Sequence, residues 1–206
     1  MRSLWLLHEL GIPFEVKTYP FDASIKSPDY LARHPAGRVP ALELDGCVLF
    51  ESGAITEVLC ERFSPDTLGR SPSHPERADW LNWVHFAETI SQHVAHLTQQ
   101  HIMLFEDHMR SPTVMKLEAK RLAKTFGVVD AALGNRSWLL NGFSAADIGA
   151  AQAVYMGQHF VKTDDFPQLA RWLKNCHTRS GFKAAMPIGP GIYAKDFYPP
   201  WQSQNG

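Results

Sequence analysis

The chain has 206 residues, of which 45% are hydrophobic and 20% are charged, and its formal net charge is −1. This composition is typical of a soluble globular protein, and without runs of like charge it gives no reason to expect nucleic acid or a membrane surface as a partner. The sequence shows neither an apolar run of about 20 residues, the length of a membrane span, nor a signal-peptide pattern. We therefore expect a cytoplasmic protein that acts on small molecules.

The cysteines give no sign of a covalent framework or a metal cage. Cys47, Cys60 and Cys176 are widely spaced, and their number is odd. Disulfide scaffolds and structural zinc sites use paired cysteines at short spacings. We therefore interpret the three as core or surface thiols.

The first predicted elements are a helix and a strand. Apolar residues from Leu4 to Leu10, followed by Gly11-Ile12-Pro13, predict a helix that ends at a Gly-Pro stop. Apolar and polar residues then alternate from Phe14 to Tyr19, as in a half-buried strand. Ser27-Pro28 predicts the start of a short helix, because proline suits the first helical turn.

The next stretch predicts a hairpin and a helix start. Ala41 to Leu44 and Cys47 to Phe50 are short apolar runs separated by Asp45-Gly46, a dipeptide that accepts the positive φ angles of a tight turn. The two runs should pair antiparallel. Ser52 stands where an N-cap belongs, ahead of a helix expected to reach Phe63.

This stretch suits a ligand that is both an amino acid and a peptide. The helix start near Ser52 offers unpaired N–H groups and a positive dipole end, which favour a carboxylate. Glu51 can receive an ammonium group. Val39 is held extended by the following Pro40, so its backbone N–H and C=O can pair with an extended peptide.

Residues 37–42 (Gly-Arg-Val-Pro-Ala-Leu) followed by residues 51–55 (Glu-Ser-Gly-Ala-Ile) resemble the glutathione site of the cytosolic glutathione S-transferases. The resemblance implies that Val39, before a cis-Pro40, pairs with the cysteinyl backbone of glutathione. It also implies that Glu51 and Ser52 hold the γ-glutamyl end. The alternative is that a Val-Pro bond and a capped helix only serve the folding of a thioredoxin-like domain.

The glycyl carboxylate of glutathione needs a cation or a hydrogen-bond donor. Arg38 precedes the Val-Pro bond, and its planar guanidinium suits a carboxylate. His34 is a rival for the same role.

The beginning of the sequence bears on the chemistry. Residues 2–15 look like the first helix of the transferase family, in which a strand and a turn with a catalytic Ser, Tyr or Cys normally come earlier. Ser3 is then the remaining hydroxyl near this helix, and we keep it as the catalytic candidate. We expect the 206-residue chain to turn over an aryl halide poorly, and an upstream extension to restore activity.

After residue 63 the composition changes. Residues 65–75 are rich in proline and small polar residues, which is typical of a linker. Helical periodicity then dominates. The first predicted helix starts near Pro75. Three more are predicted, and they span Thr113–Leu133, Ala145–Gln158 and Phe166–His177. We therefore predict a glutathione-binding domain (1–64), a linker (65–75) and an all-helical domain with an irregular tail (76–206).

Two features of the helical part have contrasting interpretations. Trp83, Phe86 and Ile90 on its first helix are expected, by family position, to line the cleft for a hydrophobic co-substrate. Ser144 and Asp147 form a predicted capping box, which resembles a buried folding motif of the transferase helical domain.

The histidines and the tail leave alternatives open. His85, His93, His96, His101 and His108 lie on or after the first long helix, but no carboxylate or cysteine at ligand spacing accompanies them. We therefore predict no metal and prefer a role in lining the cleft. The aromatic tail, residues 188–206, is expected either to pack across the helical part or the cleft, or to be partly ordered.

Together these features predict an α/β thioredoxin-like domain that lacks its first strand, joined to an all-α bundle as in glutathione transferases. The resemblance implies a homodimer that conjugates glutathione, its co-substrate, to a hydrophobic electrophile in detoxification, or catalyses a related glutathione-dependent reaction. The alternative is a non-catalytic binding or scaffolding protein with the same fold.

Overall fold

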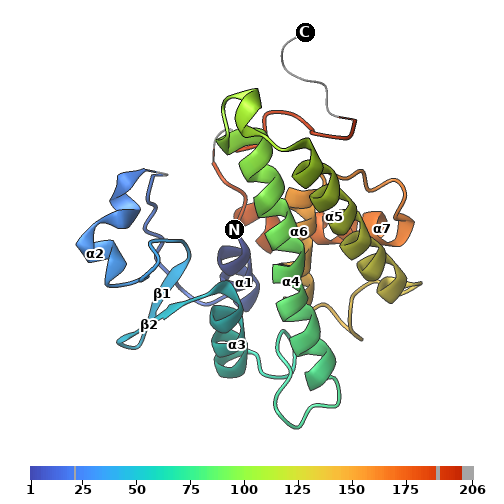
Figure 1. The fold of residues 1–206 in the computed structure, drawn as a ribbon. Coiled ribbons are helices and arrows are strands. Elements are labelled where there is room, and N and C mark those ends of the chain that lie inside the picture. The colour runs from blue at the N-terminus through green and yellow to red at the C-terminus, as the bar shows by residue number, and fades with distance from the viewer. Residues whose placement is uncertain (21, 189–190, 201–206) are drawn as a thin grey trace.

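The computed structural model describes residues 1–20, 22–188 and 191–200. A small region with a hairpin lies beside a larger group of helices (Figure 1). The first part of the chain forms α1 (Arg2–Leu10), a 3₁₀ turn η1 (Ala23–Lys26), α2 (Pro28–Leu31), β1 (Ala41–Leu44), β2 (Cys47–Phe50) and α3 (Ser52–Phe63).

The local signals for the first two α-helices are confirmed. Gly11 ends α1 in the left-handed conformation, with a φ of 64°, and its N–H donates to the carbonyl of His8. Pro28 occupies the first turn of α2, and the side chain of Ser27 accepts a hydrogen bond from the N–H of Tyr30.

The hairpin also forms as predicted. β1 and β2 pair antiparallel, with Ala41 opposite Phe50 and Leu44 opposite Cys47. Asp45 and Gly46 have φ angles of 48° and 78°. Two consecutive positive φ angles match the right-handed twist of the paired strands.

The strand predicted from Phe14 to Tyr19 is wrong. This segment is irregular, and the described sheet consists of β1 and β2 alone. An alternating pattern makes a strand only where another strand supplies backbone partners. In the described part of the chain no such partner lies beside residues 14–19, and Val16 is 52% exposed.

The second part of the chain is helical, as predicted. Its helices are α4 (Arg77–Thr98), a π-helical turn η2 (Gln99–Met103), a 3₁₀ turn η3 (Asp107–Met109), α5 (Pro112–Leu133), α6 (Ala145–Gly157), α7 (Pro167–Thr178) and α8 (Ser180–Ala184). The four predicted helices are present, with ends within about two residues of the expected ones. The three short elements η2, η3 and α8 were not predicted. The division at residues 64 and 75 stays a prediction.

Helix α4 is central to the core, since it packs against both α6 and α5. Trp80, Phe126 and Trp172 are fully buried and belong to one hydrophobic cluster that also includes α1 and α3 residues. The capping box is confirmed, because the N-cap residue Ser144 and Asp147 make both reciprocal hydrogen bonds. Asp147 therefore serves folding at the start of α6.

The tail packs across the ends of α4 and α6, one of the two expected arrangements. The hydroxyls of Tyr193 and Thr98 are 2.7 Å apart. The N–H of Phe197 donates to the carbonyl of His159 at 2.6 Å. Residues 189–190 and 201–206 of the predicted tail lie outside the described residues.

Candidate functional site

The open end of the hairpin brings the two predicted binding motifs together. Because Ala41 lies directly opposite Phe50, the preceding Val39-Pro40 and the following Glu51-Ser52 flank the same end of one ladder. The Val39-Pro40 peptide bond is cis. Val39 is 66% exposed, so solvent reaches this residue.

The start of α3 differs in detail from the prediction. Glu51, with φ 70° and ψ 116°, is the N-cap residue, and Ser52 is the first residue of the helix. The prediction that Ser52 is the N-cap is therefore wrong. The reason lies in the backbone: the Ile55 N–H donates to the Glu51 carbonyl at 3.0 Å, so the first helical hydrogen bond closes on Glu51. The Ser52 hydroxyl accepts a hydrogen bond from Arg2 at 2.8 Å. The first turn of α3 still presents backbone N–H groups ahead of the hairpin end.

The two candidates for binding the glycyl carboxylate, His34 and Arg38, differ in their burial. His34 is 5% exposed, its ring lies 5.2 Å from that of Phe50, and its Nδ1 has no hydrogen-bond partner among the described residues. Arg38 is exposed, and its carbonyl accepts a 2.6 Å hydrogen bond from the Tyr30 hydroxyl. The exposed guanidinium is therefore the more accessible candidate.

Ser3 lies in the first turn of α1, next to Arg2. Its Oγ is buried and has no hydrogen-bond partner in the described part of the chain. A bond from this hydroxyl to a ligand sulfur would need the side chain to rotate outward.

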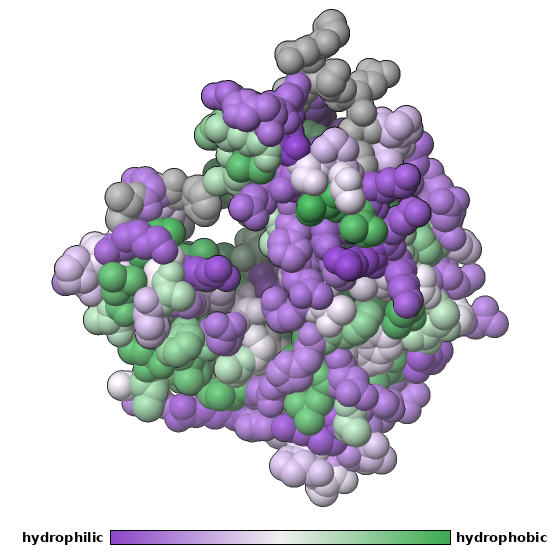
Figure 2. Space-filling view, in the orientation of Figure 1, coloured by the Kyte–Doolittle hydropathy of each residue, from purple (hydrophilic) through white to green (hydrophobic). Residues whose placement is uncertain are grey.

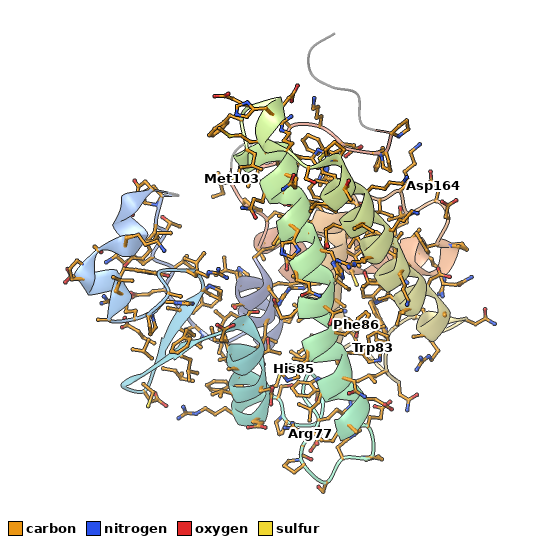
Figure 3. The ribbon with its side chains drawn as sticks, viewed as in Figure 1. Arg77, Trp83, His85, Phe86, Met103 and Asp164 are labelled. Atoms are coloured by element: carbon orange, nitrogen blue, oxygen red, sulfur yellow. The ribbon has the colours of Figure 1, made fainter. Side chains whose placement is uncertain are left out.

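The three residues expected to line a co-substrate cleft are not equivalent. Ile90 is fully buried, so it offers no surface to a ligand. Trp83 and Phe86 are partly exposed, and their rings pack edge to face at 5.4 Å. Figure 3 places both on the side of α4 nearer α5, whereas His85 lies on the side nearer α3, where its Nε2 is 2.9 Å from Glu57.

An apolar tip between α4 and α5 was missed by the sequence reasoning. Met103, Phe105 and Met109 are 42%, 84% and 50% exposed. Figure 2 shows a hollow between the hairpin region and the helices, and Figure 3 places Met103 at the end of α4 above it. The available signal was the apolar run at residues 102–105, which follows the periodic part of α4.

The histidines of α4 find a carboxylate that the linear sequence did not pair with them. Nδ1 of His93 and of His96 lie 2.7 and 3.3 Å from one carboxylate oxygen of Glu118 on α5. Although burial opposes it, the hydrogen bonds from His93, Arg121 and His96 hold the pKa of Glu118 below its usual value. Among residues 1–20, 22–188 and 191–200, no group of three or more histidine, cysteine, aspartate or glutamate side chains is arranged to hold a metal ion.

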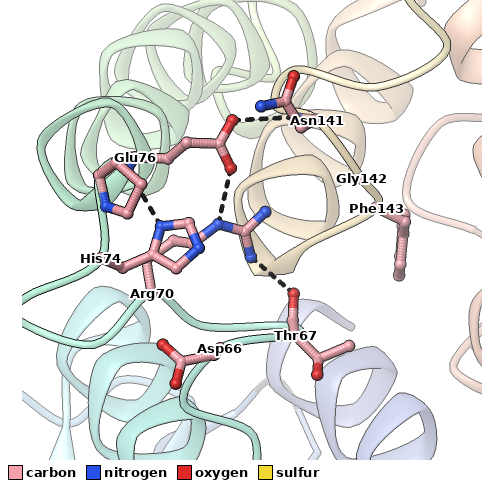
Figure 4. Close-up of a pocket in the computed structure, with 9 residues that line it drawn as sticks. Asp66, Thr67, Arg70, His74, Glu76, Asn141, Gly142 and Phe143 are labelled. Carbon is pink, nitrogen blue, oxygen red and sulfur yellow. Dashed lines mark hydrogen bonds and ion pairs between the residues drawn. The ribbon is translucent and has the colours of Figure 1, made fainter.

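A separate open pocket of about 550 Å³ lies where residues 66–76 meet residues 141–143 (Figure 4). Buried Arg70 pairs with Glu76 at 3.0 Å, and Glu76 accepts a hydrogen bond from the N–H of Asn141. These bonds tie the segment before α4 to the segment before α6. None of the predicted glutathione residues lines this pocket.

Among the described residues, no helix is long and apolar enough to cross a membrane.

Known proteins resemble this chain in both sequence and fold. Residues 1–62 match the family model described as "Glutathione S-transferase, N-terminal domain". Glutathione S-transferase F10 of Arabidopsis thaliana is 30% identical over 155 residues, which cover 71% of each chain. The crystal structure of glutathione transferase F7 from Populus trichocarpa superposes with a TM-score of 0.74 at 27% identity, covering 88% of this chain and 90% of that one.

A more distant structure supports the fold alone. Glutathione transferase URE2P6 from Phanerochaete chrysosporium, solved with oxidized glutathione, has a TM-score of 0.78 at 22% identity and covers 88% of this chain and 87% of its own. The cis peptide before the hairpin, the Glu-Ser helix start and the helical bundle are features that the sequence resemblance implied. This chain belongs to the glutathione S-transferase family.

Proposed function

We propose that the chain binds glutathione at the open end of the hairpin and joins it to a hydrophobic electrophile. The observation that carries the proposal is the hairpin register, which sets Val39-Pro40 and Glu51-Ser52 at one end of the same ladder. Val39 would pair with the cysteinyl backbone, Glu51 with the ammonium group, and Ser52 with the γ-glutamyl carboxylate. Arg38 would hold the glycyl carboxylate, with His34 as the rival donor.

The reaction needs an ionised thiol. The glutathione thiol loses its proton to solvent, the sulfur lone pair forms a bond to the electrophilic carbon, and the leaving group departs with its bonding electron pair. The thiolate is the nucleophile, so a donor to sulfur raises the rate by lowering the thiol pKa. Ser3 is the candidate donor, because α1 carries one hydroxyl side chain and this side chain is Ser3.

The co-substrate would occupy the hollow beside the glutathione seat. Met103, which lies above this hollow, supplies exposed apolar surface, and methionine adapts to ligands of different shape. Trp83 and Phe86 keep their predicted role only if the co-substrate reaches the α5 side of α4. By family membership we also propose a homodimer, which sedimentation analysis would test.

Calorimetry with glutathione tests the binding site. Replacing Glu51 by Gln or Ser52 by Ala should weaken binding by about 1–3 kcal/mol each, since each removes a hydrogen bond to a charged ligand group. The control is Glu106→Gln, an exposed carboxylate paired with His108. Unchanged affinity in both site variants would refute the proposed site.

Turnover of an aryl halide distinguishes an enzyme from a non-catalytic binding protein, the second candidate function. The buried Oγ of Ser3 favours that second candidate. If Ser3 is the donor, Ser3→Ala lowers the rate about ten- to hundredfold, the strength of a hydrogen bond to a charged group, and leaves glutathione affinity unchanged. Binding without turnover in the unmodified chain would instead assign the non-catalytic role.

A further inference from the structure

The guanidinium of Arg2 lies where four helices meet. It donates to the Ser52 hydroxyl on α3 at 2.8 Å, to the Ser91 hydroxyl on α4 at 2.9 Å and to the Gln152 side-chain oxygen on α6 at 3.1 Å. The Arg2 side chain itself, on α1, is only 11% exposed. The bonds to Ser91 and Gln152 come from Nη2, which leaves Nη1 directed at Ser52.

A carboxylate already lies against this Nη1 and the Ser52 hydroxyl. The same Oε1 of Glu88, on α4, pairs with Arg2 Nη1 and lies 3.3 Å from Ser52 Oγ. The Glu88 side chain is 58% exposed, so solvent can receive it if it leaves. Arg2 would stay in place without Glu88, because Ser91 and Gln152 hold its other terminal nitrogen.

We propose that Arg2 and Ser52 together form a carboxylate seat, and that Glu88 occupies this seat until the carboxylate of the ligand displaces it. This inference rests on the proposed function, since the displacing group is the γ-glutamyl carboxylate of glutathione. Glu88 acts as an internal competitor and lowers the apparent affinity. The charge of Arg2 makes the seat selective for a carboxylate over a neutral amide.

The proposal requires opposite effects from the two members of one ion pair. Removing the Glu88 charge frees the seat, whereas removing the Arg2 charge destroys it. If Glu88 instead received the ammonium group of the ligand, its removal would weaken binding. The sign of the Glu88 effect therefore decides between the two roles.

Calorimetry at pH 7 with glutathione, on the full chain, measures this sign. Glu88→Gln should bind about 2- to 5-fold more tightly, the strength of an exposed ion pair, and Arg2→Gln about tenfold more weakly. Glu61→Gln is the matched control: it changes net charge equally, its side chain is 47% exposed and pairs with Arg77, and it lies nine residues after Ser52, about 13 Å along the helix. This control should leave affinity unchanged.

A second ligand tests selectivity. An analogue whose γ-glutamyl α-carboxylate is an amide should bind the unmodified chain about tenfold more weakly than glutathione, and Arg2→Gln should discriminate less. Arg2→Lys keeps a charge and should retain part of the discrimination, even if Arg2→Gln folds poorly.

The outcomes distinguish a failure of the proposed function from a failure of the Glu88 displacement. No glutathione binding by any variant would overturn the proposed function, and this inference with it. Binding by the unmodified chain that Glu88→Gln leaves unchanged or weakens would overturn this inference alone.

Discussion

The hairpin region, residues 11–50, and the helical part are stabilised in different ways. In residues 41–50 no side chain is fully buried, whereas α4 to α7 hold most of the large buried side chains, among them Trp80, Phe126 and Trp172. The hairpin is held by its backbone ladder, its turn and local contacts such as Tyr30 to the Arg38 carbonyl. The region that would present backbone groups to glutathione is thus the less buried one, and most global stability must come from the helices.

The largest expected effect is in the helical part, at Asp147. This fully buried side chain accepts hydrogen bonds from the N–H groups of Leu139 and Ser144 and from the indole of Trp172. Asp147→Ala leaves three buried donors unpaired and should lower the free energy of unfolding by about 3–5 kcal/mol. Urea denaturation measures the loss, with exposed Asp165→Ala as the control. A loss below about 1 kcal/mol would contradict the central role of this cap.

The next effect is a pH dependence where the tail meets the bundle. His101 is 7% exposed, between the rings of Phe160 and Phe197. Burial, then the charges of Arg110 and Lys195, lower its pKa from 6.5 to about 4. The unfolded chain therefore binds this proton first, so stability should fall by about 2 kcal/mol as pH drops from 6.5 to 4.

A variant isolates this contribution. His101→Gln cannot take up the proton, so its unfolding free energy should vary less between pH 6.5 and 4 than that of the unmodified chain. Urea denaturation at both pH values measures the difference. Equal slopes in the two proteins would exclude His101 as the source.

A smaller effect is expected at the hairpin turn. Gly46 has a φ of 78°, and a Cβ added there would meet nothing within 4 Å. The cost of Gly46→Ala is therefore conformational, about 1 kcal/mol. It should appear as faster amide exchange across residues 41–50. Gly142→Ala is the control, because that glycine also has open space and has no positive φ; equal exchange in both variants would contradict the turn argument.

The smallest effect is expected at the exposed pair between Arg33 and Glu43, 2.5 Å apart at the hairpin. Glu43→Gln should leave the urea midpoint unchanged, because solvent screens an exposed pair. A shift as large as that of Gly46→Ala would show that side-chain charges, rather than the turn, hold the hairpin.

Much of the molecule followed from local signals in the sequence. The Asp45-Gly46 turn, the Gly11 stop, the Ser27-Pro28 start and the Ser144/Asp147 capping box all formed as predicted. Each depends on the φ preferences and hydrogen bonds of residues a few positions apart, so the sequence alone contains the information. The position of Val39-Pro40 and Glu51-Ser52 at the same end of the hairpin followed in turn from its register.

What the sequence left undecided depends on partners far away in the chain. Residues 14–19 carry a strand pattern but have no paired strand in the described part of the chain, and the Ser52 hydroxyl is bound by Arg2, which lies 50 residues earlier. His93 and His96 meet Glu118 only because α4 packs against α5. A side chain's role is set by the donors and acceptors that surround it, and only tertiary packing brought Arg2, Ser52 and Glu88 into one site.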